Sequence, residues 1–421
     1  MSKYFDSRPV YTLFLWLMLP YVFFHLLWRA RKQPEYLNHI AERFGFYKLH
    51  SDKPVIWLHT VSVGETRAAA SLVRRLQQIY PGHQLLLTHT TPTGRETGEQ
   101  LYGNGVMRVY LPYDYPFAVR RFLSHFRPCA GVLLETEIWF NLIHICHTDK
   151  IPLLLLNARL SGKSAARYAR YPNLVRTGLT ELDIIAAQSQ EDAARLMALG
   201  SNHVSVMGNL KFDIGPPPAM LELGQQLRAL FGVDRKIFLA ASTREGEEAL
   251  LLDALKPLQI SGLLTVIVPR HPQRFAEVEA LLVRYGYRFQ RRSDKRPINE
   301  DTQVVLGDSM GEMFAYYASC DVAFIGGSLL PFGGQNLIEA CAVGKPVLIG
   351  PHTYNFAQAT QLAIAGRAAV QVPDAAGLVQ TLYNLISLPG RRAEMGQAGL
   401  GFVSVNQGAT ERALAHIKRL L

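Results

Sequence analysis

The feature that most constrains the fold of this chain is a regular alternation of short apolar runs with helical stretches from Pro54 onward. Short apolar runs bounded by polar residues are typical of buried strands, and strands that alternate with helices predict a parallel sheet covered by helices on both faces. The first series of strands is expected at residues 55–59, 84–88, 107–111, 131–135, 152–157, 183–187 and 203–207. Helices expected between these strands include residues 66–80, 115–126 and 190–199.

A proline-rich stretch, Gly215-Pro216-Pro217-Pro218, interrupts this alternation and predicts a stiff linker. A second series of strands follows at residues 236–241, 263–268, 303–306, 321–325, 346–349 and 369–372, and the tail from Gly408 is helical. A chain of 421 residues is also too long for one ordinary domain. We therefore expect an α/β protein with two doubly wound, Rossmann-like domains, at residues 33–214 and at residues 225–421 with the C-terminal helix. The linker is expected at 215–224, and a ligand cleft between the domains.

Three strand-to-helix junctions of the second series change abruptly from apolar to polar or glycine residues. They are Pro269-Arg270-His271-Pro272, Gly307-Asp308-Ser309-Met310-Gly311-Glu312, and Gly326-Gly327-Ser328 followed by Gly333-Gly334-Gln335-Asn336-Leu337-Ile338-Glu339. Such junctions gather at the carboxyl edge of a parallel sheet, where glycines and helix N-termini can receive a phosphate. Glu312 and Glu339 can accept hydrogen bonds from ribose hydroxyls. The three junctions together predict a nucleotide site.

Both glutamates also fit a purely structural role. Ser309-x-x-Glu312 and Asn336-x-x-Glu339 have the spacing of a capping box, in which the glutamate at position N3 only closes the start of a helix. The two roles are compatible, because a glutamate held at N3 already lies at the mouth of the sheet.

The first series contains candidate catalytic residues at its own junctions. Ser62-x-x-Glu65 is a third capping-box pattern, so Glu65 is either a helix cap or a general base that takes the proton of an attacking hydroxyl. Glu135 and Glu137 lie at the end of a long apolar run, where a carboxylate needs a partner or a function. Lys211 precedes the linker and is either a solvated lysine or a group that reaches a phosphate across the cleft.

The formal net charge of +10 predicts a negatively charged partner, such as nucleic acid, anionic lipid or an acidic substrate. Nucleic acid is disfavoured, because no recognisable nucleic-acid module and no long run of Lys or Arg is present. A basic face follows the strand at 152–157 and includes Arg159, Lys163, Arg167, Arg170 and Arg176, with Tyr168 and Tyr171 among them. We expect this face to meet phosphates or anionic headgroups, with an ordinary solvated helix face as the alternative.

Residues 10–28 form an apolar stretch without Asp, Glu, Lys or Arg. Nineteen residues are about the minimum that spans a bilayer, and a membrane helix tolerates Pro20 better than a soluble one. Arg29, Arg31 and Lys32 follow, and basic residues beside a span usually stay cytoplasmic. We expect residues 1–32 to be a single membrane anchor that holds the body at the cytoplasmic face of the inner membrane. An interfacial helix and a buried core helix are the alternatives, and a signal peptide is disfavoured because no small-residue cleavage site follows.

A set of long motifs runs through nearly the whole chain in order. They are HTVSVGET, THTTPTGRETG, LPYD, LETEIW, LNARLS, GNLKFD, VPRHPQRF, GDSMGEM, FIGGSL, GGQNLIEA and GPHTYNF. With these motifs the chain resembles the bacterial 3-deoxy-D-manno-octulosonic acid (Kdo) transferases of lipopolysaccharide biosynthesis. The resemblance implies a GT-B glycosyltransferase with CMP-Kdo as donor and the tetraacyl lipid A precursor, lipid IVA, as acceptor.

The resemblance also implies roles for individual residues. The family's proton acceptor falls on Glu65, and two residues associated with transition-state stabilisation fall on Glu135 and Lys211. Contacts to CMP fall on Pro269, Arg270, Met310, Gly311, Glu312, Asn336, Leu337, Ile338 and Glu339. The chain departs from the pattern at Gln335, where relatives often have histidine, and this puts only local donor contacts in doubt.

The implied reaction is one inverting displacement, because β-linked Kdo on CMP becomes an α-linked product in this family. It needs one base and positive charge around the leaving phosphate, which Glu65, Lys211, Arg270 and helix N-termini would supply. No cofactor or metal is expected, since a monophosphate leaves and the chain has no D-x-D or Cys/His ligand cluster. The widely spaced cysteines, Cys129, Cys146, Cys320 and Cys341, are expected to be buried thiols of a reducing compartment. The alternatives are another sugar-nucleotide transferase or epimerase of the same fold, or a non-catalytic membrane protein that binds lipid or nucleotide.

Overall fold

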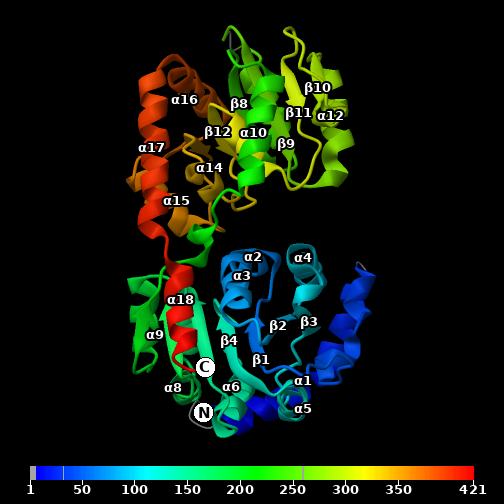
Figure 1. Cartoon of the computed structure of the whole chain (residues 1–421), viewed down its shortest axis with the longest axis vertical. Coiled ribbons are helices and arrows are strands. Elements are labelled where there is room, and N and C mark those ends of the chain that lie inside the picture. The colour runs from blue at the N-terminus through cyan, green and yellow to red at the C-terminus, as the bar shows by residue number, and fades with distance from the viewer. Residues whose placement is uncertain (1–5, 32, 258–259) are drawn as a thin grey trace. The chain divides into compact units, whose positions relative to one another are not determined.

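The computed structural model describes residues 6–31, 33–257 and 260–421. The chain forms two compact units, Met1–Ile214 with Gln407–Leu421 and Gly215–Asn406, and each is described by itself (Figure 1). Residues 1–5 and Lys32, which the sequence assigns to the anchor and its basic flank, lie outside the described residues.

The first unit is built on a parallel sheet of seven strands, as its alternating sequence predicts. The strands are β1 (Val55–His59), β2 (Gln84–His89), β3 (Met107–Tyr110), β4 (Pro128–Leu134), β5 (Leu153–Ala158), β6 (Ile184–Ala187) and β7 (Val204–Val206). Their order is β3-β2-β1-β4-β5-β6-β7, so the chain winds outward in both directions from β1. This doubly wound order confirms the Rossmann-like arrangement and places a topological switch point between β1 and β4, where ligands bind in such sheets.

Helices cover both faces of this sheet. They are α2 (Val63–Ala68), α3 (Ala70–Ile79), α4 (Pro92–Tyr102), α5 (Pro116–Phe126), α6 (Phe140–Thr148), α7 (Gly162–Tyr168), α8 (Pro172–Thr180), α9 (Gln190–Ala198) and α18 (Ala409–Lys418), with 3-10 turns η2 (Pro34–Leu37), η3 (Ile40–Phe44), η4 (Gly103–Gly105) and η5 (Leu210–Asp213). The helix expected at 66–80 is two helices, with the break at Ala69. Trp57 and Phe122 centre the core on one face, and Leu58 and Leu72 centre the core on the other.

The last helix, α18, packs on the first unit and not on the second, to which the sequence assigned it. Ala409, Ala413 and Ile417 recur at helical spacing and enter the core that also contains Leu58. The carboxylate of Asp213 accepts hydrogen bonds from the backbone N–H groups of Gly408 (2.7 Å) and Thr410, and so fixes the start of the helix. An apolar stripe on α18 thus completes the first core, although it follows the second unit in sequence.

The second unit also contains seven parallel strands, in the order β10-β11-β9-β8-β12-β13-β14. They are β8 (Lys236–Thr243), β9 (Leu263–Pro269), β10 (Phe289–Arg291), β11 (Val304–Leu306), β12 (Val322–Ile325), β13 (Val347–Ile349) and β14 (Ala369–Gln371). The helices are α10 (Pro218–Phe231), α11 (Glu247–Leu255), α12 (Phe275–Tyr285), α13 (Met313–Ser319), α14 (Ile338–Ala342), α15 (Ala357–Ala365), α16 (Ala375–Ser387) and α17 (Pro389–Asn406), with 3-10 turns η6 (Pro272–Arg274) and η7 (Arg292–Asp294). Helix α10 begins at Pro218, so much of the stretch expected as linker, 215–224, is helical.

Helix α1 (Arg8–Ala30) is the apolar helix expected near the N-terminus. It has 23 residues and contains a window of mean hydropathy 1.8, which makes it long and apolar enough to cross a membrane. Only 6% of that window is buried, so the interpretation as a buried core helix is wrong. The spanning and interfacial interpretations are compared below.

Candidate functional site

The carboxyl edge of the first sheet brings the three candidate catalytic residues together. Glu65 lies in the first turn of α2 after β1, Glu135 follows β4 directly, and Lys211 lies in η5 after β7. The ammonium group of Lys211 is 3.4 Å from the Glu135 carboxylate, and the charge of Glu135 acts on Glu65. These residues are distant in sequence but share one edge because all seven strands are parallel.

The capping prediction for Ser62 and Glu65 is confirmed. Ser62 is the N-cap residue of α2, and its side chain accepts a hydrogen bond from the Glu65 backbone N–H (3.3 Å). The Glu65 carboxylate accepts hydrogen bonds from the Val61 backbone N–H (2.7 Å) and from the Ser62 hydroxyl (3.0 Å). Both carboxylate oxygens are therefore fixed, and the residue is only 9% exposed.

Burial raises the pKa of Glu65 to about 7. The hydrogen bonds from Val61 and Ser62 oppose this rise, whereas the charges of Glu135 and Glu137 add to it. A carboxyl group that titrates near neutral pH can both take and release a proton under ordinary conditions. Capping and proton transfer are thus compatible roles for this one residue.

Glu135 is held in an unusual backbone conformation at the end of β4. Its φ angle is +62°, in the left-handed region that residues other than glycine rarely occupy. Its backbone carbonyl accepts a hydrogen bond from the N–H of Arg159 (3.3 Å), and Lys211 pairs with its side chain. Strained positions of this kind cluster at functional sites, because the surrounding contacts must hold them there.

The residues around Lys211 anchor η5 so that Lys211 meets Glu135. Leu210 and Phe212 are buried, and the Leu210 N–H donates to the side chain of Asn157 (3.1 Å). The neighbouring Asp213 holds the start of α18. The three other residues of η5 therefore have structural roles. The half-buried Lys211 lies at the carboxyl edge of the sheet with the candidate catalytic carboxylates.

Three further polar residues lie at the same carboxyl edge: Glu137, already noted from the sequence, and the histidines that end β1 and β2, which were not among the predicted site residues. The carboxylate of Glu137 is 3.7 Å from the ring of the buried His59 and accepts a hydrogen bond from the indole N–H of Trp139 (2.7 Å). His89 is buried, which lowers its pKa to about 3 and keeps it neutral. The sequence shows these histidines only as single residues in apolar strands, where buried structural histidines also occur.

The residues of the basic face expected after β5 lie on α7, on α8 and in the segments next to α7, and all are exposed to solvent. They are Arg159, Lys163, Arg167, Arg170 and Arg176. The backbone bond between Arg159 and Glu135 joins the start of this face to the candidate catalytic edge. An anionic group bound at Arg159 would therefore lie close to Glu135.

The carboxyl edge of the second sheet collects the junctions after β9, β11 and β12. Pro269 ends β9, and the N–H of Arg270 donates to the Thr243 carbonyl at the end of β8 (3.0 Å). The buried Tyr317 lies close enough to both Arg270 and Glu339 that their charges act on its hydroxyl. Burial, first of all, and then Glu339 raise the pKa of this tyrosine. The first and third junctions are therefore neighbours.

Glu312 is not the N3 residue of a capping box, so the structural prediction for Ser309 and Glu312 is wrong. Helix α13 begins at Met313, and Glu312 is its N-cap residue without a capping side-chain bond. The Ser309 hydroxyl donates to the Glu312 carboxylate (2.7 Å), which also pairs with Arg292 (3.3 Å). The preceding Met310 and Gly311 are exposed.

The capping-box prediction for Asn336 and Glu339 is also wrong. Helix α14 begins at Ile338, and the Asn336 side chain accepts from the Ile338 N–H (3.0 Å) and donates to the Glu339 carboxylate (3.1 Å). The side-chain amide of Asn336 therefore stabilises a local turn and orients Glu339. The side chains of Leu337 and Ile338 are buried, so a ligand at this junction would meet their backbone.

The glycine loop after β12 already holds an anion of the protein itself. The buried carboxylate of Glu247 accepts hydrogen bonds from the N–H groups of Gly327 (2.6 Å), Ser328 (2.9 Å) and Leu329 (2.9 Å). It also accepts from the N–H of Arg244 (2.8 Å). These backbone donors are therefore not available to a phosphate, although the glycine pattern alone predicts that they could be.

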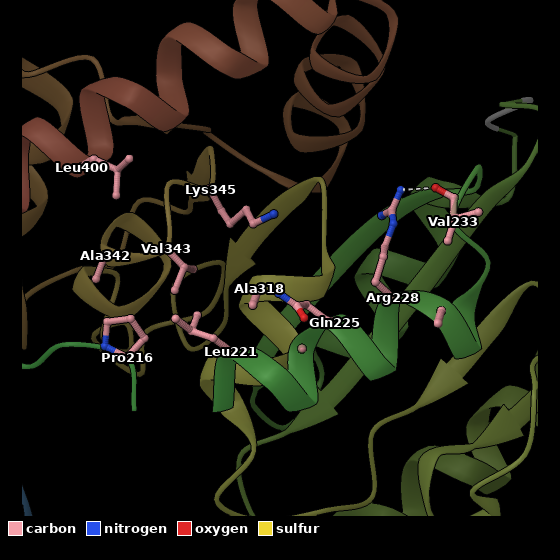
Figure 2. Close-up of a pocket in the computed structure, with 12 residues that line it drawn as sticks. Pro216, Leu221, Gln225, Arg228, Val233, Ala318, Ala342, Val343, Lys345 and Leu400 are labelled. Carbon is pink, nitrogen blue, oxygen red and sulfur yellow. Dashed lines mark hydrogen bonds between the residues drawn. The ribbon is translucent and has the colours of Figure 1, made fainter. Parts of the chain in front are cut away.

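A separate groove lies at the amino edge of the second sheet (Figure 2). It is lined by Leu221 of α10, by Val343 and Lys345 before β13, and by Leu400 of α17, while Arg228 is engaged by the Val233 carbonyl (2.9 Å). The described residues that line it include no carboxylate and no histidine. Among these lining residues the groove therefore offers no carboxylate or imidazole as a general base.

The described residues contain no group of three or more His, Cys, Asp or Glu that could hold a metal ion. All four cysteines are free thiols; Cys146, Cys320 and Cys341 are buried, as expected, and Cys129 is half-buried.

Comparisons with known proteins match both units of the chain. Residues 38–214 match the family model of the 3-deoxy-D-manno-octulosonic-acid transferases (kdotransferase), and residues 251–401 match the model of glycosyl transferases group 1. A 3-deoxy-D-manno-octulosonic acid transferase of Bordetella pertussis is 41% identical over 97% of this chain and 98% of its own. One of Haemophilus influenzae is 38% identical over 98% of this chain and 99% of its own.

Among solved structures, a glycosyltransferase of Rickettsia africae is similar over 88% of this chain and 99% of its own, with a TM-score of 0.59. Its sequence identity of 14% means that the likeness concerns the fold alone. Two Rossmann-like units with this likeness confirm the GT-B class.

Replacing Glu247 tests whether its carboxylate stabilises the glycine loop. Glu247→Ala leaves at least three buried N–H groups without an acceptor, so we expect a clearly lower melting temperature, equivalent to several kcal/mol. The matched control is Glu245→Ala, which removes a half-exposed carboxylate two residues away and should change stability by about 1 kcal/mol or less. Equal melting temperatures for the two variants would contradict the structural role.

Proposed function

Because the chain belongs to the 3-deoxy-D-manno-octulosonic acid (Kdo) transferase family and is therefore a glycosyltransferase, we propose that it transfers Kdo from CMP-Kdo to the lipid A precursor lipid IVA. The observation that supports the mechanism is the buried Glu65 carboxyl group, whose pKa lies near 7 beside the Lys211–Glu135 pair. The direct test is to incubate the pure protein with both substrates and to weigh the lipid product by mass spectrometry.

Glu65 is the proposed general base. The acceptor hydroxyl attacks the anomeric carbon of Kdo, Glu65 takes the proton of that hydroxyl, and the bond from the anomeric carbon to the phosphate oxygen breaks. The bonding electrons leave with CMP, and the proposed reaction is a single displacement with inversion. The two fixed hydrogen bonds on Glu65 orient the carboxylate before the proton moves, so little reorganisation accompanies the step.

Lys211 and Glu135 are proposed to stabilise the transition state. Their ion pair is half-buried, so the local charge is less screened than it would be in water. The ammonium group can compensate negative charge on the departing phosphate or on the Kdo carboxylate. Glu135 holds Lys211 in place and raises the pKa of Glu65.

The second unit is the proposed donor site. Glu312 and Glu339 would accept hydrogen bonds from ribose hydroxyls, while Arg270 would meet the phosphate. Pro269, Met310, Gly311 and Asn336 would line the nucleotide. Leu337 and Ile338 would meet the nucleotide through backbone atoms, because their side chains are buried, although the Ile338 N–H already donates to Asn336.

Charge and hydropathy support the proposed acceptor and location. We propose that the basic face of α7 and α8 binds the phosphates of lipid IVA and anionic lipids of the inner membrane. Helix α1 would hold the enzyme at the cytoplasmic face of that membrane. Nucleic acid is not a proposed partner.

A first prediction concerns Glu65→Gln, which keeps a hydrogen-bond acceptor but cannot take a proton. We expect normal folding and normal CMP affinity, with a loss in kcat of about 10²–10⁴. Melting temperature and CMP titration separate this effect from misfolding. Wild-type turnover in the variant would leave Glu65 as a helix cap only.

A second prediction concerns pH. A general base works only when deprotonated, so kcat/KM should rise with pH through about 7 and then level off. Glu137→Gln removes a like charge that raises the pKa of Glu65, so this rising limb should move to lower pH. Glu191→Gln, at an exposed carboxylate on α9, is the control and should leave the limb in place. A limb that stays fixed in both variants would argue against Glu65 as the titrating group.

A third prediction concerns the donor site. Glu312→Ala and Glu339→Ala should each weaken CMP binding by about 1–3 kcal/mol, because a hydrogen bond between ribose and a charged group is lost. The control is Glu279→Ala, which removes an ion pair with Arg291 in the same unit. Calorimetric titration with CMP and with UDP measures both affinity and base preference. CMP affinity unchanged in both test variants would place the nucleotide elsewhere.

A further inference from the structure

Helix α1 is fastened to the first unit at its beginning. The carboxylate of Asp6, just before the helix, is buried and accepts hydrogen bonds from the N–H groups of Asn173 (2.8 Å) and Leu174 (2.9 Å) in the first turn of α8. These donors are otherwise unpaired at a helix start, so Asp6 acts as an acidic partner of α8. The residue that precedes α1 therefore lies against the body of the first unit.

The first half of α1 makes further polar and aromatic contacts with the same body. Tyr11 donates to the buried Asp114 (2.9 Å), and Thr12 donates to Asn141 (2.8 Å). The hydroxyl of Tyr115 donates to the Leu15 carbonyl (2.8 Å). Figure 1 shows the dark-blue start of α1 beside α5 and α6. Asn141 belongs to α6, and Asp114 and Tyr115 directly precede α5.

The far end of α1 also stays with this unit. Leu26 and Ala30 are buried, and the N–H of Gln33 donates to the Arg29 carbonyl (3.0 Å) where the chain turns into η2. The Arg29 guanidinium lies over the ring of Tyr36, 5.4 Å from its centroid, and its charge acts on Tyr113, which follows β3. Both ends of α1 are thus held by one folded body.

The opposite face of α1 is apolar and largely exposed, and Trp16 at its margin stacks on Phe117 of α5. Its exposed large side chains are Leu13, Phe14, Trp16, Leu17, Tyr21, Phe23, Phe24, Leu27 and Trp28. They recur at helical spacing, with Leu17 67% and Phe24 69% exposed, while Leu26 and Ala30 face inward. A continuous apolar face of this kind marks an interaction surface, and its Trp and Tyr residues are typical of the lipid–water interface.

Basic side chains stand at both ends of this face. Arg29 and Arg31 are exposed at its end, and Arg167 and Arg170 are exposed on and just after α7, whose Tyr168 lies close enough to Tyr11 to contribute to the raised pKa of Tyr11. Cations that flank an apolar face complement a bilayer with anionic headgroups. This charge pattern favours lipid over an apolar protein partner.

We propose that α1 lies in the plane of the membrane surface as a monotopic helix, with its exposed face among the lipid chains and both of its ends on the side of the catalytic body. The proposal rests on the membrane location proposed above. A spanning α1 would carry Asp6 across a hydrocarbon core of about 30 Å, away from the backbone of α8 that it binds. It would also leave Asp114 and Asn141 of the body without the hydrogen bonds that Tyr11 and Thr12 donate to them, which is costly for buried polar groups.

A topology measurement distinguishes the two arrangements in the full-length protein. Ser7→Cys introduces a thiol just before α1 at a side chain that makes no capping bond, and Ser387→Cys introduces one at an exposed position of the body. A membrane-impermeant maleimide is added to spheroplasts or to inverted vesicles, with the unchanged protein as background for Cys129. We expect both variants to be labelled in inverted vesicles and neither in spheroplasts. Labelling of Ser7→Cys alone in spheroplasts would overturn the in-plane arrangement but leave the membrane location intact.

Vesicle binding tests the lipid face itself. The double variant Leu17→Glu with Phe24→Glu should bind vesicles of phosphatidylglycerol and phosphatidylcholine at least about tenfold more weakly. The control is Val283→Glu with Val405→Glu, which adds the same charge at exposed apolar positions of the second unit and should bind normally. Equal weakening in both pairs would overturn the proposal. Kdo transfer to detergent-solubilised acceptor, measured in parallel, reports on the proposed reaction independently of α1.

Discussion

The parallel pairing of β1 with β4 is the constraint on which the first site depends. His59 is paired in register with Leu133, so the two strands end together. The turn that leads from β1 to Glu65 therefore starts beside the end of β4, where Glu135 follows. Gly131 makes this pairing tight, because a Cβ atom there would come within 2.5 Å of the Trp57 ring. Lys211 reaches the same carboxyl edge because η5, in which it lies, follows β7, the outermost strand of the sheet. The chemistry proposed for the enzyme is therefore a consequence of strand register.

Buried carboxyl groups at the two sheet edges differ in role: one is structural and the other is a candidate general base. Glu247 is surrounded by backbone donors and serves as the anion that the glycine loop needs to hold its shape. Glu65 has fewer donors and two like-charged neighbours, so its charged form is disfavoured and its proton becomes exchangeable near neutral pH. Burial raises the pKa of both carboxyl groups, and hydrogen-bond donors oppose this rise in each. Glu247 has four backbone donors, whereas Glu65 has two donors and the added charges of Glu135 and Glu137.

Much of this arrangement could be predicted from the sequence, because buried parallel strands have a strong local signal. The strands of the first unit and the Ser62 cap of Glu65 were confirmed on that basis. The capping boxes at Glu312 and Glu339 failed because Ser309 and Asn336 bond to side chains and turns that spacing does not reveal. Strand β10 gave no signal, since Gln290 is the one buried residue among its three. The partners of Glu247 lie about eighty residues away, and such contacts have no local pattern.

The return of α18 to the first unit has a consequence for biosynthesis. The face of the first sheet near Leu58 and Leu72 lacks part of its cover until Ala413 and Ile417 leave the ribosome. The second unit, Gly215–Asn406, is contiguous and can complete its core earlier. The N-terminal unit is thus made first but finished last, and a nascent chain holds an open apolar surface throughout synthesis of the second unit. Loss of the last dozen residues would accordingly damage the half of the enzyme farthest from them in sequence.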